Sequence, residues 1–218
     1  MLHFLENHDE QRIASDEFVG SAIKAKPAMV VSSTISTSPM MLYFGQEVGE
    51  PGNENAGFGD PSRTSIFDYI GVPHHQRWMN NKKFDGGQLS IEEKELRDFY
   101  KRLLNFTIES DALMGEYADI HYYNRDNTTD YNHRVLSFVR WSENEKLIVV
   151  SSFDANDRYS FELKVPQEII SLWELEDGSY ESMDQLYQLN NKPLLIEDGV
   201  GKMILEIRPL ESFIFKLK

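Results

Sequence analysis

The sequence is notable first for what it lacks. None of its 218 residues is cysteine, which excludes disulfide bonds, thiolate metal sites and cysteine nucleophiles. Basic residues are outnumbered, with 22 Lys and Arg against 36 Asp and Glu, so the formal net charge is −14. A surface this negative repels phosphate backbones. No apolar run approaches the roughly 18 residues of a membrane span, and no signal peptide is visible. We therefore expect no nucleic acid and no membrane as partner, while localisation stays unknown because a native N-terminus upstream would not be seen.

The first half of the chain has the pattern of a βαβ unit. Residues 2–6 are expected to form a short buried strand, Ser15 to start a helix with acids in its first turn, and residues 40–44 to form a second strand. Pro27 should either kink that helix or open another. The two strands would be parallel neighbours joined by a right-handed crossover. A loop dense in Gly, Asn, Asp and Pro should follow, through Pro61, on the side where α/β sites are built.

A long helix is expected to end the first half, because Ser90 and Glu93 have the spacing of a capping box and an apolar stripe follows them. From about Asp111 the pattern has period two, which predicts short strands separated by turns. We expect these strands at residues 118–123, 134–141, 146–153, 159–165, 193–197, 202–207 and 212–217. Their short connections predict an antiparallel sandwich or small barrel of roughly 100 residues.

Polar residues cluster directly after the first expected strand. Phe-Leu-Glu-Asn-His-Asp at residues 4–9, followed by Arg12, resembles the Phe-x-x-Asn-His-Asp-x-x-Arg motif that ends the seventh barrel strand in glycoside hydrolase family 13, the α-amylase family. Residues 42–47 resemble the end of the family's eighth strand, and residues 110–115 the segment that leaves its last barrel helix. Residues 207–215 are similar to the last strands of its C-terminal β domain. These matches cover the whole chain in the family's order.

The resemblance implies an α/β plus all-β architecture. Residues 1–111 would be the C-terminal portion of a (β/α)8 TIM barrel, namely strands seven and eight with their helices, and residues 112–218 an antiparallel β-sandwich domain of α-amylase type. A complete barrel takes about 250 residues and eight strands, so we expect the chain to be the C-terminal part of a longer enzyme. Its apolar faces would then lack neighbours, which predicts self-association through the open barrel edge.

The resemblance also assigns roles to five residues. Asp9 matches the carboxylate that stabilises the transition state of glycoside cleavage, and His8 matches the histidine that binds the same sugar. Asn7 and Arg12 would complete the substrate-binding set mainly by orienting these groups. Glu47 would contact the substrate or a neighbouring loop, with a solvated acid as the equal alternative. The family's nucleophilic aspartate and acid/base glutamate lie on earlier strands, which this sequence does not contain.

These roles imply a fragment of a retaining α-glucan-active glycoside hydrolase, acting on α-glucosidic bonds in starch-like oligosaccharides. The chain alone is expected to be inactive, and a complete small hydrolase is disfavoured because two strands cannot form a pocket that positions a second carboxylate. The alternative from another class is a stand-alone carbohydrate-binding or interaction module without catalysis. We expect no cofactor and no metal site in this chain, although a full-length parent could bind calcium, as the family often does.

Histidine and tryptophan residues outside the motif give weaker signals. The adjacent His74 and His75 are expected in a solvated loop rather than in a metal or sugar site. Trp141 and Trp173 could stack on sugars, but a tryptophan in a strand pattern belongs more often to a core or a domain interface.

Overall fold

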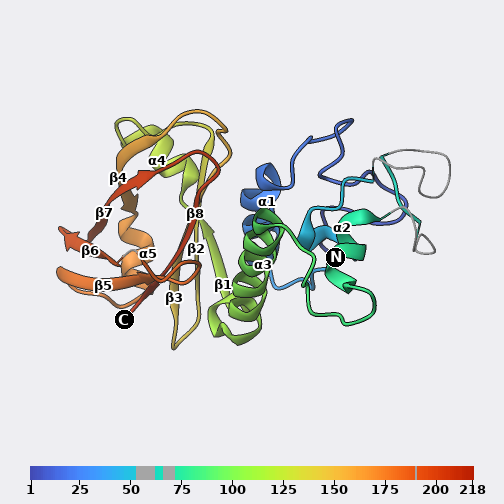
Figure 1. Ribbon diagram of the computed structural model, residues 1–218. Helices are drawn as coiled ribbons and strands as arrows, with labels where there is room; N and C mark the ends of the chain where they lie inside the picture. Colours follow the sequence, from blue (N-terminus) through green and yellow to red (C-terminus); the bar gives the residue numbers. More distant parts are fainter. Residues whose placement is uncertain (53–61, 66–71, 190) are drawn as a thin grey trace. The chain divides into compact units, whose positions relative to one another are not determined.

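The computed structural model describes most of the chain, namely residues 1–52, 62–65, 72–189 and 191–218. These residues form two compact units, which Figure 1 shows in chain colours. Unit 1 consists of Met1–Ser33 and Ser38–Leu104, and unit 2 of Thr34–Thr37 and Asn105–Lys218. The end of the loop expected to reach Pro61 lies outside the described residues. None of the helices in the described ranges is long and apolar enough to cross a membrane.

Unit 1 contains helices and turns, and no regular strand among its described residues. Its elements are η1 (Ile23–Ala25), α1 (Lys26–Thr34), η2 (Gln46–Val48), α2 (Pro73–Met79) and most of α3 (Ile91–Glu109). The strands expected at residues 2–6 and 40–44 appear only as one parallel bridge between His3 and Met40. The direction agrees with the prediction, but the length does not, because two parallel strands without further neighbours bury too little to extend.

The local helix signals had mixed outcomes. Ser15 does not start a helix, because its carbonyl oxygen accepts hydrogen bonds from Phe18 and Gly20 in a closed turn, which the left-handed Gly20 (φ 73°) ends. Pro27 lies in the first turn of α1, so it opens a helix, as the second alternative predicted. The capping box before α3 is confirmed, since Ser90 N donates to Glu93 Oε2 at 2.8 Å and Glu93 N to Ser90 Oγ at 3.2 Å.

Unit 2 is one antiparallel sheet with short helices. Its strands are β1 (Glu116–Asp119), β2 (Val135–Trp141), β3 (Lys146–Ser152), β4 (Tyr159–Val165), β5 (Gly178–Asp184), β6 (Asn191–Glu197), β7 (Val200–Ile207) and β8 (Ser212–Leu217). They are hydrogen-bonded in the order β1-β2-β3-β8-β5-β6-β7-β4. The helices of this unit are η3 (Asp111–Met114), α4 (His121–Asn127) and α5 (Gln167–Leu172).

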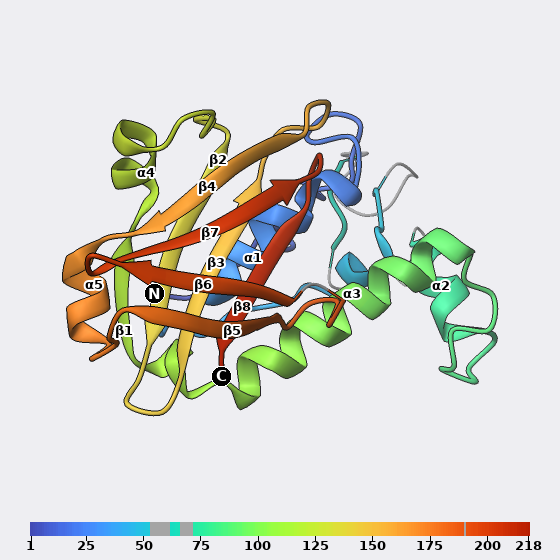
Figure 2. The same cartoon turned by 90° about the vertical axis from the view of Figure 1, so that its left-hand side faces the viewer.

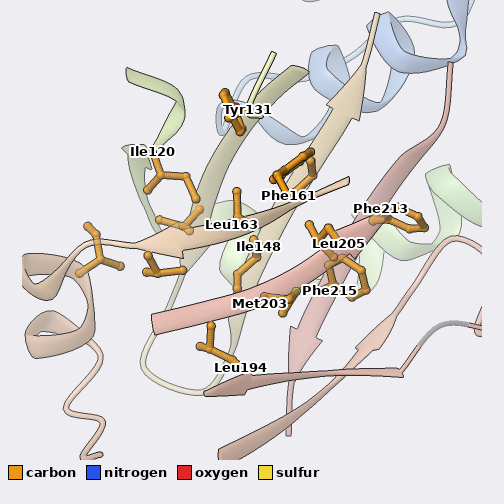
Figure 3. Packing of buried hydrophobic residues seen from close by; sticks show 14 of the residues in the cluster. Ile120, Tyr131, Ile148, Phe161, Leu163, Leu194, Met203, Leu205, Phe213 and Phe215 are labelled. Carbon is orange, nitrogen blue, oxygen red and sulfur yellow. The ribbon is translucent and has the colours of Figure 1, made fainter. Parts of the chain in front are cut away.

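The sheet curls around its own core. Figure 2 shows β1 to β3 behind β4 to β7, so the expected antiparallel sandwich or small barrel takes the form of a single sheet curled into a half-barrel. Figure 3 shows side chains from both parts meeting in the interior, among them Ile148 from β3, Leu163 from β4 and Phe215 from β8, all fully buried. Burial of each such side chain contributes roughly 1.5–3 kcal/mol, so this core is the main source of stability in unit 2.

A buried asparagine links the two edges of the sheet. Asn124 lies in α4, directly after the edge strand β1, and is fully buried. Lys164 N in the opposite edge strand β4 donates to Asn124 Oδ1 at 2.7 Å, and Asn124 Nδ2 donates to Lys164 O at 2.8 Å. The side-chain amide therefore satisfies both backbone groups of an edge residue, as a further strand would.

Two strands of unit 2 differ from the prediction. The strand expected at residues 118–123 ends at Asp119, because Asp119 Oδ1 accepts a hydrogen bond from Tyr122 N at 3.1 Å and turns the chain into α4. Strand β5 was not predicted, since its sequence is mostly polar and has no alternation of apolar and polar residues. Its Asp184 is fully buried and accepts hydrogen bonds from Ile214 N and Leu186 N at 3.2 Å.

Candidate functional site

The motif in unit 1 presents its polar residues on an exposed turn. Asn7 Oδ1 accepts hydrogen bonds from Asp9 N at 2.7 Å and from Glu10 N at 3.0 Å, which fixes the backbone of the turn. The side chains of His8 and Asp9 are 48% and 72% exposed, and His8 Nε2 lies 3.4 Å from Asp9 Oδ2. An imidazole and a carboxylate are thus held side by side, and both can reach a ligand that docks on this turn.

Arg12, in contrast, is fully buried beneath the turn. Its Nε donates to Thr64 Oγ1 at 2.7 Å, and its Nη1 donates to Glu6 Oε1 at 2.7 Å and to Phe44 O at 2.8 Å. The guanidinium carbon also lies 4.3 Å from the centre of the Tyr43 ring, a cation–π contact. The side chain is therefore placed to support the turn.

Glu6, for which no role was predicted, completes this support. Its side chain is fully buried, and while Oε1 receives Arg12, Oε2 accepts a hydrogen bond from Ile13 N at 2.7 Å. One carboxylate therefore joins the residues before and after the exposed turn. Burial raises the pKa of Glu6, and the neighbouring Arg12 opposes that rise. The burial of both partners depends on residues far along the chain, so the motif alone could not reveal this ion pair.

Glu47 lies apart from this turn in the described structure. It is half-buried in η2, between Gly45 (φ 81°) and Gly49 (φ 73°), two left-handed positions that favour glycine. No hydrogen bond or ion pair joins Glu47 to the turn within the described ranges. Burial lowers the pKa of His75, and the charge of Glu47 opposes that lowering. The structure therefore brings together four of the five predicted residues, and Glu47 belongs to a neighbouring loop.

The expectation that His74 and His75 are solvated is wrong. The buried Glu50 Oε2 accepts hydrogen bonds from His74 N at 2.9 Å and His75 N at 3.2 Å, so it caps the start of α2. His75 packs between the rings of Phe44 and Trp78, at centroid distances of 5.2 and 5.5 Å. Among the residues that the structure describes, no group of three or more carboxylate or imidazole side chains could hold a metal ion.

Comparisons with known proteins give the family context of unit 2. The sequence model described as "Alpha amylase, C-terminal all-beta domain" matches residues 126–218. A comparison with curated proteins finds no match.

Several solved structures share the fold of the whole chain. A variant of AmyP in complex with maltotriose aligns with 100% of this chain and 41% of its own, at a TM-score of 0.62 and 19% identity. The maltogenic α-amylase AmyB from Thermotoga neapolitana aligns with 99% of this chain and 40% of its own, at a TM-score of 0.63 and 18% identity. The α-amylase from Geobacillus thermoleovorans, complexed with acarbose, aligns with 100% of this chain and 39% of its own, at a TM-score of 0.63 and 16% identity.

Residues 126–218 are therefore an α-amylase-type C-terminal β domain. The resemblance to the C-terminal part of a family 13 glycoside hydrolase is confirmed at two levels, because residues 126–218 match the α-amylase C-terminal domain and the full chain shares the fold of solved α-amylases. The chain spans about two fifths of the length of these solved structures. With identities of 19% or less, the likeness concerns the fold and not the activity.

Proposed function

We propose that the chain is the C-terminal part of a retaining α-amylase-family hydrolase that acts on α-glucosidic bonds in starch-like oligosaccharides. The observation that carries the proposal is that amylase structures match the whole chain, while the motif residues His8 and Asp9 stand exposed on a fixed turn. Residues 1–111 would then contribute strands seven and eight of a (β/α)8 barrel, meeting where His3 and Met40 form their parallel bridge. Residues 112–218 would be the C-terminal β domain.

In this proposal the exposed turn contacts the sugar at the cleavage point. The Asp9 carboxylate accepts hydrogen bonds from sugar hydroxyls, and these bonds strengthen as the ring flattens toward an oxocarbenium-like transition state. A neutral His8 imidazole donates a further hydrogen bond to the same sugar. Asn7 shapes the turn and Arg12 clamps it through Glu6, so the substrate-binding role of these two is indirect. Glu47 acts from the neighbouring loop.

The chain by itself is inactive in this proposal. Retaining cleavage needs a nucleophile and an acid/base about 5 Å apart, and these would come from earlier strands of the barrel. The chain is therefore expected to release no reducing sugar from maltoheptaose. Activity that disappears in the Asp9→Asn variant and persists in a Glu10→Gln control would overturn the expectation and make the chain a complete hydrolase.

Exposed apolar side chains in unit 1 support the same proposal. Leu2, Phe4, Phe18 and Ile23 are between 41% and 56% exposed, and in a longer enzyme they would be covered by the remaining barrel. Alone, the chain should self-associate through them. Light scattering over a concentration series is expected to give a mass that rises above the 25.3 kDa of one chain. A constant monomer mass would contradict the open edge.

A further inference from the structure

A cleft in unit 2 is separate from the motif and has no role in the account so far. Its volume is about 410 Å³, within the range of small-ligand sites, about 300–1,000 Å³. The start of β1, the end of β2, the start of β3 and the end of α5 form its walls. All of its lining residues belong to unit 2, so the cleft is complete within one unit.

Two tryptophans line the cleft, Trp141 at its surface and Trp173 as part of the hydrophobic core beneath it. Trp141 ends β2 and is half-buried, whereas Trp173 follows α5 and is 3% exposed. Their ring centroids lie 6.4 Å apart at an interplanar angle of 67°. Trp173 Nε1 is buried without a hydrogen-bond partner among the described residues. An unpaired buried N–H costs roughly 1–3 kcal/mol, so a tryptophan that only filled the core would be expected to pair it.

The backbone holds this aromatic wall in place. Gly115 also lines the cleft, and a Cβ at this position would lie 2.0 Å from the carbonyl oxygen of Trp141. Only glycine therefore allows the chain to pass so close to the end of β2. The close approach brings Glu116, the next residue, to the rim.

The rim carries four charged side chains, of which Glu116 interacts electrostatically with the nearby Arg140. Glu116, Glu143 and Glu174 are exposed, and Lys146 is half-buried. Within the described ranges, none of these four side chains forms a hydrogen bond or an ion pair. Three carboxylates against one ammonium group disfavour phosphorylated or other anionic ligands.

We propose that this cleft is a non-catalytic binding site for a neutral oligosaccharide, with an α-glucan as the occupant. A pyranose ring has an apolar face that can pack on an indole and hydroxyl edges that can bond carboxylates and an ammonium group. The cleft offers both kinds of surface side by side. The class of ligand follows from this chemistry, whereas the choice of an α-glucan rests on the proposed function.

The three tryptophans of the chain provide the test. Each gives one indole N–H signal in a nitrogen-15 NMR spectrum of the full chain, assigned through single Trp→Phe variants. Titration with maltoheptaose should shift the Trp141 and Trp173 signals and leave that of Trp78 in unit 1 unchanged. Titration without a shift of either cleft signal would overturn the proposal, and an equal shift with cellopentaose would overturn the α-glucan assignment.

Variants separate the cleft from the exposed turn. Trp141→Leu should weaken maltoheptaose binding about tenfold, whereas Trp78→Leu, the same change in unit 1, should leave the affinity unchanged. Glu143→Ala, at an exposed rim position where folding is not at risk, should weaken it measurably. Asp9→Asn should leave the cleft signals as they are. If Asp9→Asn abolished the shifts while Glu143→Ala preserved them, the binding would belong to the motif, and the cleft proposal would fail while the proposed function stood.

Discussion

The buried pair of Glu6 and Arg12 should be essential to the turn that presents His8 and Asp9. We consider the single variants Glu6→Leu and Arg12→Met and the double variant. Each single change leaves one charge without its partner in a site where both side chains are 0% exposed. The double change removes both charges and fills the space with apolar side chains of similar volume.

The structure sets the expected magnitudes. Removing one partner of a buried ion pair costs roughly 3–5 kcal/mol. Arg12→Met also removes the hydrogen bonds to Thr64 Oγ1 and Phe44 O, at about 1 kcal/mol each. The double variant loses those bonds and that of Ile13 N, but it buries no unpaired charge. Its cost should therefore be at least about 2 kcal/mol less than the sum of the singles.

Hydrogen exchange resolved to peptides measures this cycle within unit 1. Peptides covering residues 1–50 should exchange faster in both single variants and recover partly in the double variant. Strand β3 in unit 2 should be unchanged, and Glu10→Leu, on the exposed side of the same turn, should resemble the wild type. The role of the Glu6–Arg12 pair would be refuted if the costs of the two single changes simply added in the double variant. It would also be refuted if the single variants kept residues 1–50 as well protected from exchange as Glu10→Leu does.

The raised pKa of Glu6 adds a pH dependence with a definite sign. A carboxyl group whose pKa is higher in the folded state favours folding when it is protonated. The contribution of Glu6 to stability is therefore complete below the ordinary pKa range of a glutamate, and it is lost as the pH rises through the raised pKa. Protection of residues 1–50 should thus decrease over that window in the wild type. A slope that Glu6→Gln leaves unchanged would assign the effect to another group.

Further predictions concern unit 2. Asn124→Ala should lower the free energy of unfolding in urea by about 2–4 kcal/mol, because buried backbone groups of β4 lose their partners. The control Asn127→Ala, exposed on the same helix, should change it by no more than about 0.5 kcal/mol. Equal costs for the two variants would contradict the link between the sheet edges. Gly115→Ala should abolish the near-UV circular dichroism of the folded unit, because its Cβ would lie 2.0 Å from a backbone oxygen of β2; a native spectrum would contradict this. The Tyr159 hydroxyl and two backbone amides hold the pKa of Asp154 well below its usual range. The contribution of Asp154 to stability is therefore present above that range and lost as the pH falls. Asp154→Asn should make unfolding in acid less dependent on pH, and an unchanged acid transition would refute this role.

Much of unit 2 could be predicted because most of its strands alternate apolar and polar residues according to which side faces the core. In β4, Phe161, Leu163 and Val165 are buried while the residues between them are more exposed, which is the alternation from which the strand was predicted. Strand β5 has no such alternation. Its buried residues Ser182 and Asp184 are polar, and they are satisfied by partners that only the tertiary structure supplies.

The motif shows the same limit at the level of the site. An exposed polar turn could be predicted from Asn7, His8 and Asp9. The clamp beneath it could not, because Arg12 reaches Phe44 and Thr64, which lie 32 and 52 residues further along the chain. Short strands in unit 1 were overestimated for a related reason, since an apolar run predicts a strand only where neighbouring strands exist to pair with it.

The most direct test of the proposed function uses the polypeptide encoded by the complete reading frame. It should release reducing sugar from maltoheptaose, Asp9→Asn should reduce kcat by about 10²–10³-fold, and the neighbouring Glu10→Gln should retain it. The upstream sequence should supply the remaining βα units, with an aspartate and a glutamate at strand ends. A reading frame that begins at Met1, or full activity in Asp9→Asn, would contradict the account.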